Sequence, residues 1–101
     1  MSIREIVTFS VHPQTERGAL ARAAKEAERF LGTLPGYRGR ELYFDEGHDV
    51  YVDIVTWDDM DAAMAGAEKA MQSAQCAAFF GMIRGESVTM LHAAPVALGG
   101  A

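Results

Sequence analysis

The fold of this chain is decided by two consecutive segments, DVYVDIVTW at residues 49–57 and DDMDAAMAGAEKAM at residues 58–71. The first is rich in β-branched and aromatic residues, which favours a strand. Asp58 is expected to cap the helix that follows, with Asp59 and Asp61 adding negative charge to its first turn. The only tryptophan, Trp57, lies at the junction. Apolar residues at helical spacing predict one buried face of this helix, formed by Met60, Ala63, Met64, Ala67 and Met71.

The segments on either side predict the order strand, helix, strand, strand, helix, strand. Residues 3–12 alternate between a mixed face and an apolar face that only Glu5 interrupts. A polar turn with a glycine at residues 45–48 favours a hairpin, in a register that places Arg40 opposite Asp53. The other expected elements are a helix at about 15–33, a strand at 37–44, a short apolar helical turn at 76–83, a strand at 86–93 and a loose tail at 94–101.

This order predicts an α+β, ferredoxin-like βαββαβ fold, with a four-stranded antiparallel sheet and two helices on one face. Right-handed crossovers are expected to place the first and third strands in the middle, side by side and parallel. That alignment would put His12 at the same sheet edge as Trp57, and His92 at the opposite edge. The sheet face without helices still carries large apolar side chains, so we expect a homodimer whose two sheets pack face to face.

The composition limits the class of protein. The 101 residues correspond to a single domain, residues 1–101, and the net charge of -5 argues against nucleic acid or an anionic membrane as partner. There is no apolar run of the ~20 residues needed to cross a bilayer, and no signal-peptide pattern. With Cys76 as the only cysteine, no internal disulfide is possible. A cytoplasmic protein is the simplest interpretation.

Over residues 3–93, three local patterns resemble the antibiotic biosynthesis monooxygenase (ABM) family of the dimeric α+β barrel superfamily. They are Pro35-Gly36-Tyr37 before residues 39–43, residues 51–57 before the acidic start of the second helix, and Phe79-Phe80 before residues 88–92. The resemblance implies a twofold dimer that closes a barrel. Characterised members of this family include cofactor-independent monooxygenases of phenolic polyketides and quinols and haem-degrading enzymes, whereas many other members have no assigned reaction.

The haem-degrading branch of that family uses an asparagine on the first strand, a tryptophan ending the third and a histidine on the second helix. Only Trp57 matches; the helix position about three turns later holds Ala67. The sequence also lacks a metal-ligand motif and a glycine-rich phosphate loop. We therefore expect no cofactor and no metal.

Six residues are candidates for a site. Trp57 could donate its indole N–H to a substrate oxygen and stack on an aromatic ring, or it could simply cap the core. His12 could act as a general base, or be an exposed residue before Pro13. Packing explains the rest equally well, but they could line a substrate pocket: Tyr51, Tyr43, Met64 and Phe80.

Two functions remain open from the sequence. One is an ABM-like monooxygenase that uses O2 on a small aromatic or quinol-type substrate without a metal or flavin. The other is a non-catalytic, small-ligand-binding or accessory barrel protein. A roomy apolar pocket with converging polar groups between helices and sheet would favour the enzyme. A pocket filled by Trp57 and the methionines would favour the second function.

Overall fold

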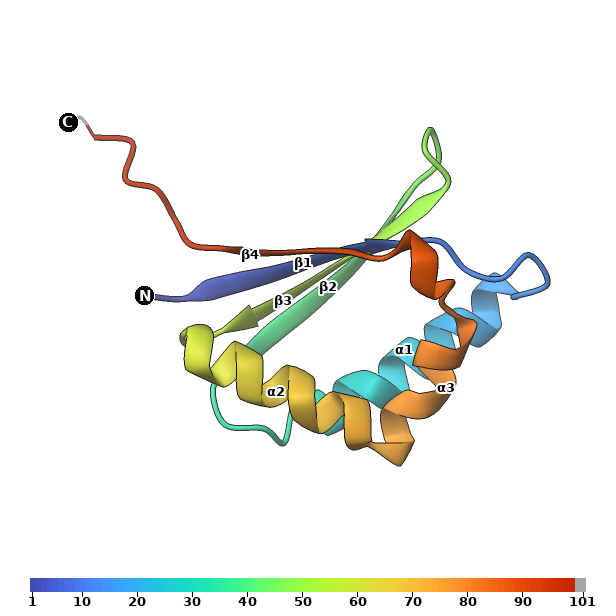
Figure 1. Cartoon of the computed structure of the whole chain (residues 1–101), viewed down its shortest axis with the longest axis horizontal. Helices are drawn as coiled ribbons and strands as arrows, with labels where there is room; N and C mark the ends of the chain where they lie inside the picture. Colours follow the sequence, from blue (N-terminus) through green and yellow to red (C-terminus); the bar gives the residue numbers. More distant parts are fainter. Residues whose placement is uncertain (100–101) are drawn as a thin grey trace.

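The computed structural model describes residues 1–99, which form a four-stranded sheet with its helices on one side (Figure 1). The α+β, ferredoxin-like fold predicted from the sequence is confirmed. The predicted short helical turn is a separate helix, because Ser73 Oγ accepts a hydrogen bond from the Gln75 amide at 3.1 Å and caps it. In chain order the elements are β1 (Ile3–Phe9), α1 (Arg17–Leu31), β2 (Tyr37–Asp45), β3 (Val50–Trp57), α2 (Met60–Gln72), α3 (Ala74–Met82), a 3-10 turn (Gly85–Ser87) and β4 (Thr89–Ala93).

The strand order is β2-β3-β1-β4, and every neighbouring pair is antiparallel. The expectation that the first and third strands run parallel is wrong. The crossover through α1 returns β2 in the direction of β1, and the hairpin then reverses β3. Trp57 consequently pairs with Ile3, at the end of the sheet where β1 begins. His12 lies beyond the other end of β1, whereas His92 pairs with Glu5 near Trp57, so both predicted edge positions are also wrong.

The β2–β3 hairpin differs from the predicted register by two residues. Asp45 pairs with Val50, so the loop is residues 46–49 and Arg40 lies opposite Val55. The loop begins one residue later than predicted because Asp49 takes a left-handed backbone, φ 54°, which aspartate tolerates better than most residues. Arg40 and Asp53 are nevertheless diagonal neighbours on one face, and their predicted ion pair is confirmed at 2.6 Å.

Helix α2 begins one residue later than predicted and buries a different face. Its N-cap is Asp59, whose carboxylate accepts from the Ala62 amide at 2.8 Å; the predicted cap at Asp58 is wrong. The buried residues are Ala63, Gly66 and Ala70. Small side chains face inward because the helix backbone approaches the indole of Trp57 too closely for larger ones. The predicted methionine face is therefore wrong in part, and its exposed members are Met60, Met64 and Met71.

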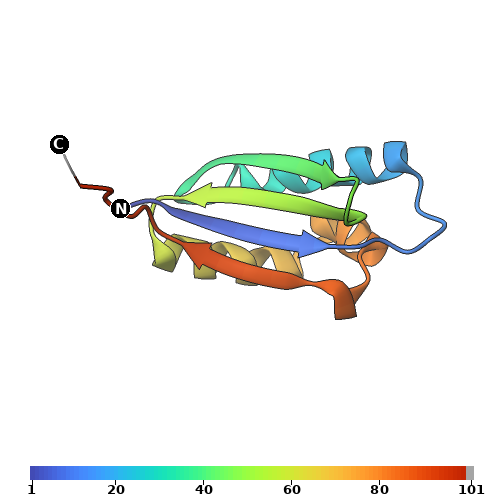
Figure 2. The ribbon, with the colours of Figure 1, turned by 90° about the horizontal axis from the view of Figure 1, so that it is seen from above.

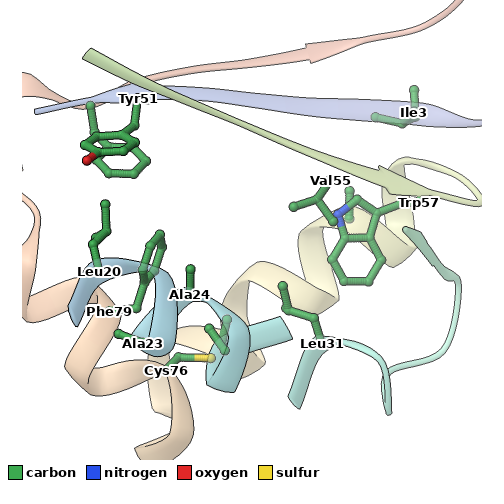
Figure 3. Packing of buried hydrophobic residues seen from close by; sticks show 14 residues of the cluster. Ile3, Leu20, Ala23, Ala24, Leu31, Tyr51, Val55, Trp57, Cys76 and Phe79 are labelled. Carbon is green, nitrogen blue, oxygen red and sulfur yellow. The ribbon is translucent and has the colours of Figure 1, made fainter. Parts of the chain in front are cut away.

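The core lies between the sheet and the helices. Figure 3 shows Leu20 and Ala24 of α1 and Phe79 of α3 beneath Tyr51 and Val55 of the sheet. Figure 2 shows the opposite sheet face, on which no helix lies. Strand pairing places the following apolar side chains on that free face: Ile6, Tyr43, Val52, Ile54 and Leu91.

After β4 the chain leaves the body of the protein. Residues 94–99 carry no regular secondary structure and extend away from the sheet (Figure 1). Val96 and Leu98 are 80% and 95% exposed. The last part of the predicted tail, residues 100–101, lies outside the described residues.

Candidate functional site

A cavity of about 380 Å³ lies between the sheet and helices α2 and α3. This volume is at the lower end of the range for small-molecule sites, roughly 300–1,000 Å³. Most of its wall is apolar, formed for example by Val7 and Val55 of the sheet and Ala70 of α2. Exposed apolar residues lie at its rim: Met71, Phe80, Val88 and Met90. The cavity therefore has the character of a small-molecule site rather than of a simple packing void.

Trp57 forms one end of this cavity. Its side chain is 1% exposed, and its ring meets the edge of Tyr37 at 5.9 Å between centroids. Among the buried side-chain nitrogen and oxygen atoms of residues 1–99, Trp57 Nε1 alone has no hydrogen-bond partner. Figure 3 shows this nitrogen on the ring edge beside Val55. An unpaired buried donor costs about 1–3 kcal/mol.

A row of polar side chains crosses the sheet face that forms the cavity floor. Val55 pairs with Arg40 on one side and with Glu5 on the other, and Glu5 pairs in turn with His92. Directly paired residues point to the same face, so Arg40, Glu5 and His92 all point toward the helices. Glu5 is 8% exposed and its Oε2 lies 3.1 Å from His92 Nε2.

Arg40 and Asp53 are a buried ion pair in the same wall. The two carboxylate oxygens accept from Nε at 2.8 Å and from Nη2 at 2.6 Å, while Nη1 donates to the Ala24 carbonyl at 2.7 Å. The guanidinium also lies 4.9 Å from the centre of the Phe79 ring. Burial alone would lower the pKa of Arg40, but the hydrogen bonds and charge of Asp53 outweigh it, and the pKa is raised. The wall thus carries a fixed guanidinium group whose positive charge is compensated by Asp53.

Two of the predicted site residues, Trp57 and Phe80, line the cavity. Three others lie elsewhere. Met64 is 58% exposed on α2, and Tyr43 is on the free sheet face, where its hydroxyl donates to Glu41 at 2.8 Å. His12 binds the Met82 carbonyl through its backbone amide at 3.0 Å and is not part of the cavity wall.

Tyr51 is a core residue beside the site rather than part of it. Its ring stacks on Phe9 at 5.5 Å and tilts against Phe44 at 4.8 Å. The sequence interpretation did not select Glu5, Arg40 or Asp53, which line the cavity. A signal for Glu5 was present, since it is the one charged residue on an otherwise apolar strand face.

In residues 1–99 no group of three histidine, cysteine, aspartate or glutamate side chains is placed to hold a metal ion. Among the same residues, no helix has the length and apolar character that a membrane span requires.

Comparison with known proteins gives the fold. No protein-family model matches the chain, and none of the curated proteins does. Solved structures do match: a mutant of SnoaB, a cofactor-independent oxygenase from Streptomyces nogalater, has 17% identity and TM-score 0.75 over 98% of each chain. A Bordetella bronchiseptica protein, whose name assigns it to the antibiotic biosynthesis monooxygenases, has 18% identity and TM-score 0.80 over 94% of this chain and 97% of its own. The chain therefore has the fold of the antibiotic biosynthesis monooxygenase-type structures.

Proposed function

We propose that this protein is an ABM-like, cofactor-independent monooxygenase that acts on a small aromatic, quinol-type substrate in the cavity beside Trp57. The observation that carries the proposal is an apolar cavity of about 380 Å³ lined by Trp57, whose buried indole N–H has no hydrogen-bond partner in residues 1–99. Such a donor is suited to a single oxygen on a flat apolar ligand. The fold shared with SnoaB, named a cofactor-independent oxygenase, supports the same reaction class.

The oxidation of an anthrone by O2 illustrates the proposed reaction. The methylene group of the anthrone loses a proton to give an electron-rich anion, and O2 is the oxidant. One oxygen atom becomes the new carbonyl oxygen, the other leaves as water with the two methylene hydrogens, and four electrons pass from carbon to oxygen. The protein has to bind the anion, exclude water and hold its oxygen against Trp57 Nε1, all of which are positioning and electrostatic effects.

Oxygen uptake with anthrones and reduced quinols tests this function. Wild type should consume O2 faster than the spontaneous reaction, and Trp57→Phe should lower kcat by about 100-fold, the effect of removing one donor to a developing oxyanion. His48→Phe is the matched control, because it also replaces a polar aromatic side chain by phenylalanine but in the exposed β2–β3 loop. If ligands bind but no substrate raises O2 uptake, the non-catalytic ligand-binding function is the better one.

We also propose that the active form is a homodimer packed through the free sheet face. No helix of the described chain covers that face. It carries the apolar side chains of Ile6, Val52, Ile54 and Leu91. Burying more than ~1,000 Å² of such surface would give a stable contact that persists at high salt. Light scattering at micromolar protein should give twice 10.9 kDa, and a mass of 10.9 kDa would refute the dimer.

A further inference from the structure

Glu5 is the acidic group in the cavity that the proposed function has not used. It lies on the helix-facing side of β1, and its side chain is only 10% exposed. Carboxylates are seldom buried so far without a compensating partner. In residues 1–99 its side chain makes one hydrogen bond, between Oε2 and His92 Nε2 at 3.1 Å, so that Oε1 has no partner.

The register of the sheet sets Glu5 beside Trp57. Glu5 pairs directly with Val55, and Trp57 is two residues further along the same strand on the same face. Diagonal neighbours of this kind have Cα atoms about 7–8 Å apart. The cavity wall thus carries a carboxylate acceptor, Glu5, and an indole donor, Trp57, as diagonal neighbours on one sheet face.

We propose that Glu5 is the proton acceptor of this cavity, and that its ligands are phenols or quinols with an acidic hydroxyl at one end and a second oxygen at the other. The O–H bond of the ligand breaks, an O–H bond forms at Glu5 Oε1, and the electron pair stays on the ligand oxygen. Trp57 Nε1–H donates to the second oxygen. For catalytic turnover this inference rests on the proposed oxygenase function, but proton transfer on binding does not.

His92 acts as a positioning residue for the Glu5 carboxylate. Its Nε2 lies 3.1 Å from Glu5 Oε2, and because an ionised carboxylate only accepts hydrogen bonds, the tautomer with Nε2–H would hold this oxygen and leave Oε1 free for the ligand. The other charged groups in this wall are Arg40 and Asp53, whose hydrogen bonds to each other leave Glu5 without a competing cation.

The test uses 1,2-dihydroxyanthraquinone, which is already oxidised and whose visible absorption moves to longer wavelength when its hydroxyl ionises. The titration is done below the pKa of the free dye, where the dye in solution is mostly neutral. With wild type the bound dye should show the absorption of the ionised form. Glu5→Gln keeps the size and the acceptor for His92 but should bind the dye in its neutral form. Glu68→Gln, at an exposed position of α2 outside the cavity wall, is the matched control and should behave as wild type.

His92 is tested in the same titration. His92→Gln retains an N–H donor and should keep the spectral shift, whereas His92→Leu should lose most of it. A Glu5→Gln protein that binds the dye and still gives the ionised spectrum would overturn the inference, as would wild type that binds only the neutral dye. A normal spectral shift without O2 uptake on any quinol would instead refute the oxygenase function and leave Glu5 as the proton acceptor.

Discussion

Gly66→Ala tests how tightly α2 packs on Trp57. In an ordinary helix interior this change stabilises by about 1 kcal/mol, because alanine is the better helix former. Here the new Cβ would lie 2.2 Å from Trp57 Cη2 and 2.7 Å from Cζ2. The indole is 1% exposed, so it can move only by disturbing its neighbours. Overpacking costs up to about 3 kcal/mol, and subtracting the helix gain leaves a net loss of about 2 kcal/mol.

The assay is urea unfolding at fixed protein concentration, with Gly81→Ala as the matched control. Gly81 is also in a helix, α3, but a Cβ there meets nothing within 4 Å, so this variant should be as stable as wild type or slightly more stable. In a Trp57→Phe background, where the clashing ring atoms are gone, Gly66→Ala should cost at least about 1 kcal/mol less. If Gly66→Ala raises the unfolding midpoint as Gly81→Ala does, the close packing of α2 on the indole is refuted.

Three further predictions concern other parts of the fold. Asp59→Ala should cost about 1 kcal/mol in urea unfolding through loss of the α2 cap; Asp58→Ala, whose ion pair is exposed, should change little, and equal losses would contradict the assignment of the cap. Arg40→Leu should cost about 3–5 kcal/mol because it leaves Asp53 buried without its partner, and a loss below about 1 kcal/mol would show that the pair is solvated. Burial raises the pKa of the Cys76 thiol, so Ellman's reagent should label the native protein far more slowly than the unfolded one, and equal rates would contradict its burial.

The order of helices and strands could be predicted because it depends on local pattern. The strand at residues 50–57 alternates strictly between buried and half-buried side chains, as its β-branched sequence indicates. Which face of α2 is buried could not be predicted from hydrophobicity. Methionines are more apolar than Gly66, but only the glycine allows the helix to reach Trp57.

The site could be predicted only in part, for a different reason. Trp57 stands out in the sequence because it is the only tryptophan and ends a strand. Glu5 and His92 are 87 residues apart, and their contact depends on the direction and register of the pairing between β1 and β4. The wrong strand direction alone was enough to move His12 into the predicted site and His92 out of it.

The proposed function requires that small aromatic ligands occupy the cavity against Trp57. Because Trp57 is the only tryptophan and lines the cavity, tryptophan emission comes from a residue of the cavity wall. Titration with 1,2-dihydroxyanthraquinone should quench the emission along a saturable curve that ends at one ligand per chain. Free N-acetyltryptophanamide, measured in parallel, corrects for light absorbed by the dye. Quenching that matches the free amide and never saturates would contradict the claim.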